Sequence, residues 1–273
     1  MGEHLSELAA LGSVLDGMQR IAVAVSGGVD SLTLAAFAHR NLPGRVAMYH
    51  AVSPAVPREG TQRTRELAVR EGWTLQVIDA GEFENESYRA NPVNRCFYCK
   101  SSLYGAIRPL TTAQIVSGTN LDDLGEYRPG LIAAREHGVR HAFVEAAMNK
   151  VKVRALAREL GLGDVAELPS SPCLSSRVET GIAIDPDVLA SIHATERLVS
   201  AELDPRTVRC RVRAGAIVVE LDTAALERLD RSRSQALAEA VREIFSATHA
   251  HTPVRFEAYR TGSAFLHLKS RDE

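Results

Sequence analysis

The chain has 273 residues, of which 45% are apolar and 24% charged, and its formal net charge is −2. This size and apolar content allow a sizeable core in one large domain or two smaller ones, and the near-neutral charge gives no argument for broad nucleic-acid binding. Residues 1–20 predict an amphipathic helix with acidic residues, so they favour neither a signal peptide nor a membrane span. No other segment reaches the ~20 apolar residues that cross a bilayer, and we expect a soluble, cytoplasmic protein.

Strands and helices alternate in the first part of the chain. The continuous apolar run at residues 21–25 predicts a strand covered on both faces, which is typical of a parallel sheet. Further strands are expected at residues 45–52, 74–79 and 114–117, and helices at 31–39, 61–71, 129–137 and 150–160. This order predicts a doubly wound parallel α/β sheet. The polar segment 81–95 is expected to be a loop over the active edge of that sheet.

The chain changes character near residues 169–172. Beyond this point we expect helices at 186–200 and 232–247 and strands at 207–213, 216–221 and 254–259. That order indicates a smaller α+β domain. The sequence therefore predicts a first domain of residues 1–177 and a second of residues 178–273.

A Ser-Gly-Gly-Val-Asp-Ser segment begins at Ser26, directly after the first predicted strand. Gly27 and Gly28 allow backbone amides to approach phosphate oxygens, and the helix start offers N–H groups and a favourable dipole end. Ser26 and Ser31 can add hydroxyl donors, and Asp30 makes sense if it holds Mg²⁺ against the phosphates. The alternative is an ordinary glycine-rich turn. A kinase or GTPase loop is disfavoured because Gly-Lys-Ser/Thr is missing.

This loop resembles that of the PP-loop (HUP-like) ATP pyrophosphatases, the relatives of NAD synthetase, GMP synthetase and the tRNA thiolases. The resemblance implies that ATP activates a substrate oxygen as an adenylate and releases pyrophosphate. It also implies nucleotide-binding roles for the Gly-Thr-Asn segment that begins at Gly118 and for Lys150. Strand ends in such sheets are where ligands bind. Asp122 and Asp123 are either metal ligands or a solvated loop pair.

The chain has four cysteines. Without an export signal we do not expect disulfides, and the Cys-x-x-Cys pair indicates metal or redox chemistry. Cys96, Cys99 and Cys173 suit a [4Fe–4S] cluster with one open iron, which could pass a hydrosulfide to an adenylate. Two alternatives remain: Cys173 attacks the activated carboxyl, with sulfur from that cysteine or a persulfide, or the pair is a lone redox or structural motif. Cys210 is expected to be a small core residue.

Three further segments are more particular than the loop: Tyr-Arg-Pro-Gly-Leu from Tyr127, Val-Arg-Ala-Leu-Ala from Val153 and Cys-Leu-Ser-Ser-Arg from Cys173. With them the whole chain resembles the LarE family of pyridinium-3,5-biscarboxylic acid mononucleotide sulfurtransferases, which serve nickel-pincer nucleotide cofactor synthesis. The resemblance implies that the cysteine before Ser-Ser-Arg is the sulfur site. Members with all three cysteines are associated with an iron–sulfur cluster, whereas others sacrifice the single cysteine.

The same resemblance implies that Arg177, Glu196, Arg209 and Arg211 form a pocket for the substrate phosphate, since guanidinium forks suit phosphate. Strand alternation places Arg209 and Arg211 on one face, although each arginine alone could be a solvated surface residue. The expected partners are a small nucleotide substrate and a sulfur donor of unknown identity. The size also allows a homo-oligomer.

The preferred hypothesis is an ATP-dependent sulfurtransferase with ATP, Mg²⁺ and a [4Fe–4S] cluster. It adenylates a carboxylate of a pyridinium mononucleotide and inserts sulfur to give a thiocarboxylate, with release of AMP and pyrophosphate. A tRNA thiolase on the same scaffold is the second hypothesis, but the net charge of −2 and the lack of an RNA-binding module or zinc ribbon argue against it. The third is a nucleotide- or metal-binding protein without catalysis, which the setting of Cys173 disfavours.

Overall fold

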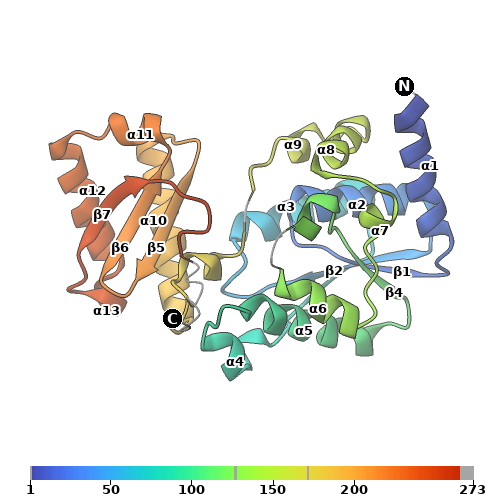
Figure 1. Ribbon diagram of the computed structural model, residues 1–273, viewed down its shortest axis with the longest axis horizontal. Coiled ribbons are helices and arrows are strands. Elements are labelled where there is room, and N and C mark those ends of the chain that lie inside the picture. The colour runs from blue at the N-terminus through green and yellow to red at the C-terminus, as the bar shows by residue number, and fades with distance from the viewer. Residues whose placement is uncertain (1, 126–127, 171, 265–273) are drawn as a thin grey trace, which may run out of the picture. The chain divides into compact units, whose positions relative to one another are not determined.

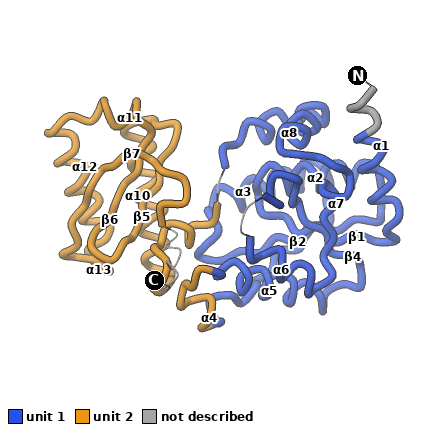
Figure 2. Tube along the Cα trace, viewed as in Figure 1, with its two compact units in different colours: residues 1–85, 94–171 blue, residues 86–93, 172–273 orange. Residues whose placement is uncertain are grey.

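The computed structural model describes residues 2–125, 128–170 and 172–264, and side chains from residue 7 onward. Tyr127, where one of the family-like segments begins, lies outside the described residues. The chain forms two compact units, which Figure 2 colours separately. The first contains Met1–Asn85 and Asn94–Ser171, and the second contains Glu86–Val93 and Pro172–Glu273.

The first unit is built on a four-stranded sheet in the order β3-β2-β1-β4, in which every pair of neighbours is parallel. Its strands are β1 (Ile21–Ala24), β2 (Val46–Ala51), β3 (Leu75–Ile78) and β4 (Gln114–Ser117). β1 is buried along its whole length, because layers cover both faces of the sheet. The predicted parallel sheet and its strands are confirmed.

Helices cover both faces of this sheet (Figure 1). One face carries α1 (Gly2–Asp16), α2 (Val29–Asn41), α3 (Arg58–Glu71), α7 (Ala142–Glu145), α8 (Lys150–Glu159) and α9 (Gly163–Ala166). The other face carries α5 (Arg95–Ile107) and α6 (Pro129–Glu136). Alternate residues of β1 point to the two cores: Ile21 and Val23 to the first, Ala22 and Ala24 to the second. The sheet is therefore doubly wound, as expected.

The order of the strands fixes where a ligand is expected. After β1 the chain crosses through α2 to β2 on one side, whereas β4 lies on the other side of β1. The carboxyl ends of β1 and β4 thus form a topological switch point, which is where open parallel sheets bind ligands. The Ser26 loop leaves β1 at this point.

The amino-terminal segment forms α1, which ends at Asp16 rather than near residue 20 as expected. Leu11 and Leu15 of this helix are buried in the first core. Among the described residues, no helix combines the length and the apolar character that crossing a membrane requires.

The segment 81–95, expected to be a loop, is partly helical. It forms η1 (Glu82–Glu84), α4 (Glu86–Arg89) and the start of α5. The buried amide of Asn91 donates to the backbone oxygens of Glu179 and Ile182, both at 2.9 Å, which attaches Glu86–Val93 to the second unit. The expectation was wrong because turns of three or four residues are too short to show an apolar period.

The second unit has a three-stranded mixed sheet in the order β5-β6-β7. β5 (Val208–Arg213) and β6 (Ala216–Leu221) are antiparallel, and β7 (Val254–Ala258) is parallel to β6. α10 (Pro186–Leu203) packs against β5 and α12 (Arg231–Ile244) against β7. The shorter helices are η4 (Leu174–Arg177), α11 (Thr223–Glu227) and α13 (Ser246–His249). The expected small α+β fold is present, with the predicted helix 232–247 divided into α12 and α13.

Candidate active site

The segment that joins β1 to α2 forms a tight glycine loop. Gly27 has a φ of 81°, a left-handed conformation that favours glycine. A Cβ atom on Gly27 would lie 2.5 Å from the carbonyl oxygen of Gly60 in α3. Gly28 is the N-cap of α2, and within the described residues no side chain caps this helix start. The first N–H groups of α2 are therefore available to an anion.

The two serines of the loop bond to each other. The Ser26 amide donates to the Ser31 hydroxyl at 3.0 Å, and the two hydroxyl oxygens are 3.1 Å apart. The Ser31 hydroxyl also lies 3.2 Å from the carbonyl oxygen of Gly28. These contacts close the loop on the first turn of α2, so both predicted hydroxyl groups lie at the amino-terminal end of the helix.

Asp30 connects three elements of the first unit. Its Oδ1 accepts a hydrogen bond from the Asn120 side-chain amide at 3.2 Å, and its Oδ2 forms an ion pair with Lys150 at the start of α8. The structure thus brings together Asp30, the Gly-Thr-Asn segment and Lys150, which were predicted separately. The Asp30 carboxylate is therefore paired with the ammonium group of Lys150 in this structure.

Gly118 lies directly against the first turn of α2. A Cβ atom on Gly118 would lie 2.6 Å from the Ser31 nitrogen and 2.8 Å from the Asp30 carbonyl carbon. Both are backbone atoms, which cannot move aside without deforming the helix start. The close approach therefore requires glycine at this position.

The acidic pair after Gly118 orders the neighbouring backbone. A carboxylate oxygen of Asp123 accepts from the Asn120 amide at 3.0 Å, and one of Asp122 accepts from the Lys150 amide at 3.1 Å. Asp123 also pairs with Arg128 at 2.9 Å. These carboxylates hold the segment that carries Asn120 and the start of α8.

A cavity of about 440 Å³ lies between the end of β2 and the first turns of α3. It is lined by Val52, Ser53, Val56, Arg58, Thr61, Gln62, Arg65 and Glu66. Since β1 and β2 are parallel, this cavity and the glycine loop both lie at the carboxyl ends of the strands. Its volume is in the range of small-molecule sites.

The cysteines divide between the two units. Cys96 and Cys99 are the second and fifth residues of α5, three residues apart and therefore on one helix face. Cys173 is the N-cap of η4 in the second unit, and all three side chains are half-buried. Among the described residues, no three His, Cys, Asp or Glu side chains gather as a metal site. A cluster on these cysteines stays a prediction.

Cys210 is a core residue, as expected. It is buried in β5 of the second unit, and burial raises the pKa of its thiol far above the ordinary value. The thiol is therefore held neutral and is unsuited to act as a nucleophile.

Arg177 and Glu196 form a buried pair in the second unit. The Nε and Nη2 atoms of Arg177 donate to the two carboxylate oxygens at 2.9 and 3.1 Å. The Nη1 atom donates to the Pro172 carbonyl oxygen at 2.7 Å and to the Ser176 hydroxyl at 3.0 Å. The Arg177 side chain is only 2% exposed. It therefore ties η4 to α10 through bonds within the fold.

Arg209 and Arg211 of β5 lie next to this pair and differ in exposure. Arg211 is buried and donates to Glu220 and to the Ser176 carbonyl oxygen, both at 3.0 Å. Arg209 is half-buried, and its pKa is lowered by burial and then by the nearby charge of Arg177. The structure thus gathers the four predicted residues within one unit, with Arg209 the more exposed of the two strand arginines.

Two histidines near strand ends were not predicted as site residues. His50 is buried near the end of β2, and His141 lies 2.8 Å from the hydroxyl of Ser117, the last residue of β4. The Ser117 hydroxyl is in turn 3.1 Å from that of Thr119. A polar residue close to the end of an apolar strand is the signal that could have indicated His50.

Comparison with known proteins decides the family. The pyridinium-3,5-bisthiocarboxylic acid mononucleotide synthase of Lactiplantibacillus plantarum is 31% identical over 230 residues, which cover 82% of this chain and 82% of that protein. The chain belongs to the pyridinium-3,5-bisthiocarboxylic acid mononucleotide synthase family. An uncharacterised Synechocystis protein is 31% identical over 261 residues (94% and 96% of the chains), and one from Methanocaldococcus jannaschii is 25% identical over 185 residues (66% and 69%). No protein-family model matches the chain.

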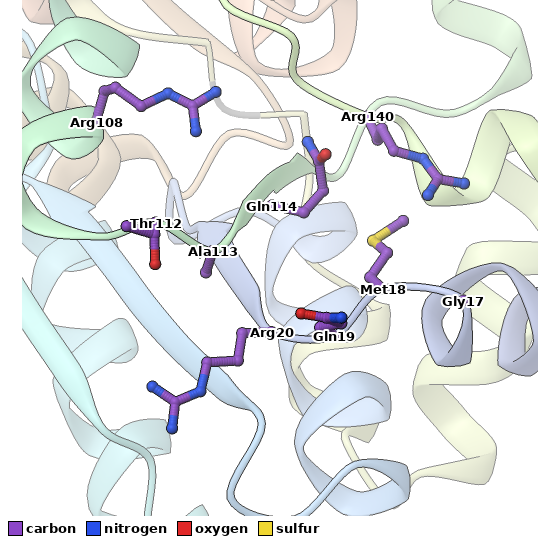
Figure 3. A pocket seen from close by; sticks show the side chains of 9 residues that line it. All are labelled: Gly17, Met18, Gln19, Arg20, Arg108, Thr112, Ala113, Gln114 and Arg140. Carbon is purple, nitrogen blue, oxygen red and sulfur yellow. The ribbon is translucent and has the colours of Figure 1, made fainter.

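A second cavity, of about 360 Å³, lies at the opposite ends of the strands of the first sheet. Figure 3 shows Arg20, Arg108 and Arg140 among its lining residues. Arg140 pairs with Glu145, and Arg108 donates to the carbonyl oxygen of His137 at 3.0 Å. Because this cavity lies at the amino ends of β1 and β4, it is separate from the glycine loop.

Proposed function

We propose that this chain is an ATP-dependent sulfurtransferase that forms a thiocarboxylate on a pyridinium mononucleotide. The name of the Lactiplantibacillus relative describes a product with two thiocarboxylic acid groups. The observation that carries the ATP part is the glycine loop, which leads from the switch point of a parallel sheet into a helix start that no described side chain caps. On this basis we assign the first unit to the PP-loop ATP pyrophosphatases.

The phosphates of ATP would bind the first N–H groups of α2 and the hydroxyl groups of Ser26 and Ser31. The nucleoside would occupy the cavity of about 440 Å³ beside α3. Asp30 would hold Mg²⁺ through its carboxylate oxygens, which in this structure pair with the ammonium of Lys150 and the amide of Asn120. Lys150 would balance phosphate charge, and Gly118 would let β4 approach the loop.

The chemistry has two steps. A substrate carboxylate oxygen attacks the α-phosphorus of ATP, which forms an acyl adenylate and releases pyrophosphate. A sulfur nucleophile then forms the C–S bond, and AMP leaves with the electron pair of the broken C–O bond. We propose Cys173 as the sulfur site, with Cys96 and Cys99. Three thiolates suit a [4Fe–4S] cluster with an open iron, which would supply sulfide when bound.

The second unit would hold the substrate. Arg209, half-buried next to the Arg177–Glu196 pair, would offer its guanidinium group to the substrate phosphate, whereas Arg211 is buried against Glu220. In this proposal the first unit activates the carboxylate with ATP, and the second unit binds the nucleotide substrate and contributes to any oligomer.

The test is to incubate the purified chain with ATP, Mg²⁺ and pyridinium-3,5-biscarboxylic acid mononucleotide. We expect AMP and pyrophosphate in equal amounts, and a product in which mass spectrometry finds sulfur in place of oxygen. Asp30→Asn should abolish pyrophosphate release, whereas Asp16→Asn, in an exposed pair with Arg45, should not. Release of ADP or phosphate alone would contradict the proposal, and tight, salt-sensitive tRNA binding would favour a tRNA thiolase.

The sulfur source is tested separately. Anaerobic purification should give a brown protein with about four irons per chain, and a colourless, active protein would favour thiol-only chemistry. We expect Cys173→Ala to stop thiocarboxylate formation while ATP–pyrophosphate exchange continues, because activation precedes sulfur transfer. Full activity of Cys173→Ala would exclude chemistry at this cysteine.

A further inference from the structure

The first turns of α3 contact the backbone of the glycine loop. The Nη1 atom of Arg63 donates to the carbonyl oxygen of Gly27 at 2.8 Å. The carbonyl oxygen of Gly60 lies 2.5 Å from the position that a Cβ atom on Gly27 would take, and it accepts a hydrogen bond from the Thr64 hydroxyl at 2.8 Å. Gly27 is therefore held between its own strand and α3.

A buried histidine holds the backbone at the start of the loop. The Nδ1 atom of His50 lies 2.8 Å from the carbonyl oxygen of Val25, and Nε2 lies 2.9 Å from the Thr61 hydroxyl. A carbonyl oxygen only accepts, so Nδ1 carries the proton, and in the neutral ring Nε2 accepts from Thr61. His50 thus joins the end of β1 to α3.

These contacts fix the direction of two amides. In a planar trans peptide the carbonyl and the N–H of one unit point to opposite sides. The Val25 carbonyl shares its peptide with the Ser26 N–H, and the Gly27 carbonyl shares its peptide with the Gly28 N–H. Holding both carbonyls turns both N–H groups away from His50 and Arg63. The Ser26 and Gly28 amides accordingly reach hydroxyl oxygens of the loop, at 3.0 and 3.4 Å.

We infer that His50 and Arg63 are positioning residues that hold the glycine loop in its anion-binding conformation. The inference rests on the proposed ATP site at this loop. Neither side chain needs to touch a phosphate, since each acts through the peptide whose carbonyl it binds. Thr61, the partner of His50, also lines the cavity proposed for the nucleoside. One short stretch of α3 therefore serves both parts of the ATP site.

The experiment measures ATP affinity, the KM for ATP and kcat of pyrophosphate release in the full chain. Arg63→Met should raise the Kd and KM for ATP roughly tenfold, the effect of losing one hydrogen bond from a charged donor, with a smaller change in kcat. Arg63→Lys keeps a donor and should recover part of this loss. Arg70→Met removes the same charge from an exposed position of the same helix and should change the Kd by less than about twofold.

His50→Asn provides a second test. The asparagine amide can still donate a hydrogen bond to the Val25 carbonyl oxygen, but the contact with the Thr61 hydroxyl is lost. His50→Asn should therefore weaken ATP binding less than His50→Leu. The rise in melting temperature on adding ATP measures this difference in binding even if both variants are less stable than the unaltered chain. If Arg63→Met weakens ATP no more than Arg70→Met, the inference is overturned. If the unaltered chain binds no ATP, the proposed function itself fails, so the two failures are distinguishable.

Discussion

Contacts between backbone atoms decide which single residues the loop region tolerates. In Gly118→Ala the new methyl carbon would meet the Ser31 nitrogen at 2.6 Å. We expect this overpacking to cost about 1–3 kcal/mol of unfolding free energy and to weaken ATP binding, measured by urea unfolding and calorimetry. Gly12→Ala is the control, because nothing lies within 4 Å of its Cβ position in α1 and alanine favours a helix. Equal effects of the two substitutions would contradict this account.

The buried ring of His50 makes stability depend on pH. Burial lowers the pKa of His50 below its ordinary value of 6.5, the bond to Val25 partly opposes this, and the charge of Arg65 adds to it. At pH values between the pKa of His50 in the folded chain and 6.5, the unfolded chain therefore binds more protons than the folded chain. The stabilisation from the neutral ring is present above pH 6.5 and is lost as the pH falls towards the folded pKa.

Urea unfolding between about pH 7.5 and about pH 5.5 tests this expectation, since that range spans the titration of histidine. The unaltered chain should lose stability more steeply than His50→Asn, which has no titrating ring. His141, whose pKa is also lowered by burial, is present in both proteins and cancels from the comparison. Identical slopes would show that His50 does not contribute.

Among the elements of the second unit, the Arg177–Glu196 pair connects η4 to α10. Glu196→Gln would leave a guanidinium that is 2% exposed without its carboxylate, and breaking a buried pair in this way costs about 3–5 kcal/mol. Glu145→Gln, which breaks the more exposed pair with Arg140, should cost at most about 1 kcal/mol. Chemical unfolding of both variants measures the difference. Equal losses would contradict the structural role of the buried pair.

Elements with a local signal were predictable. α3 ends at Gly72, which has a φ of 67° as a left-handed C-cap, and α8 begins after Asn149, whose side chain accepts from the Lys152 amide. The four-residue α4 gave no such signal, because Asn91 and its partners near residue 180 meet only in the folded chain. Local chemistry thus predicts caps and strands, whereas short helices depend on distant contacts.

At the scale of the whole molecule, the proposed ATP residues all belong to the first unit. Binding lowers the population of opened states in the region that holds the ligand. We therefore expect ATP with Mg²⁺ to slow amide hydrogen exchange in peptides that cover residues 26–31 and 117–120, as measured by mass spectrometry. Peptides of β6, buried in the second sheet, are the control. Protection limited to β6 would contradict the placement of ATP.

The sequence by itself determined the parallel sheet, the mixed α+β second unit and the individual glycine, cysteine and arginine segments, because hydrophobic period and glycine chemistry are local properties. Only the tertiary structure decided that Asn120 and Lys150 meet on Asp30, that Arg177 is bonded to Glu196, and that His50 and Arg63 hold the loop. These contacts join residues far apart in the chain, and burial and hydrogen-bond geometry fix them only after the elements have packed.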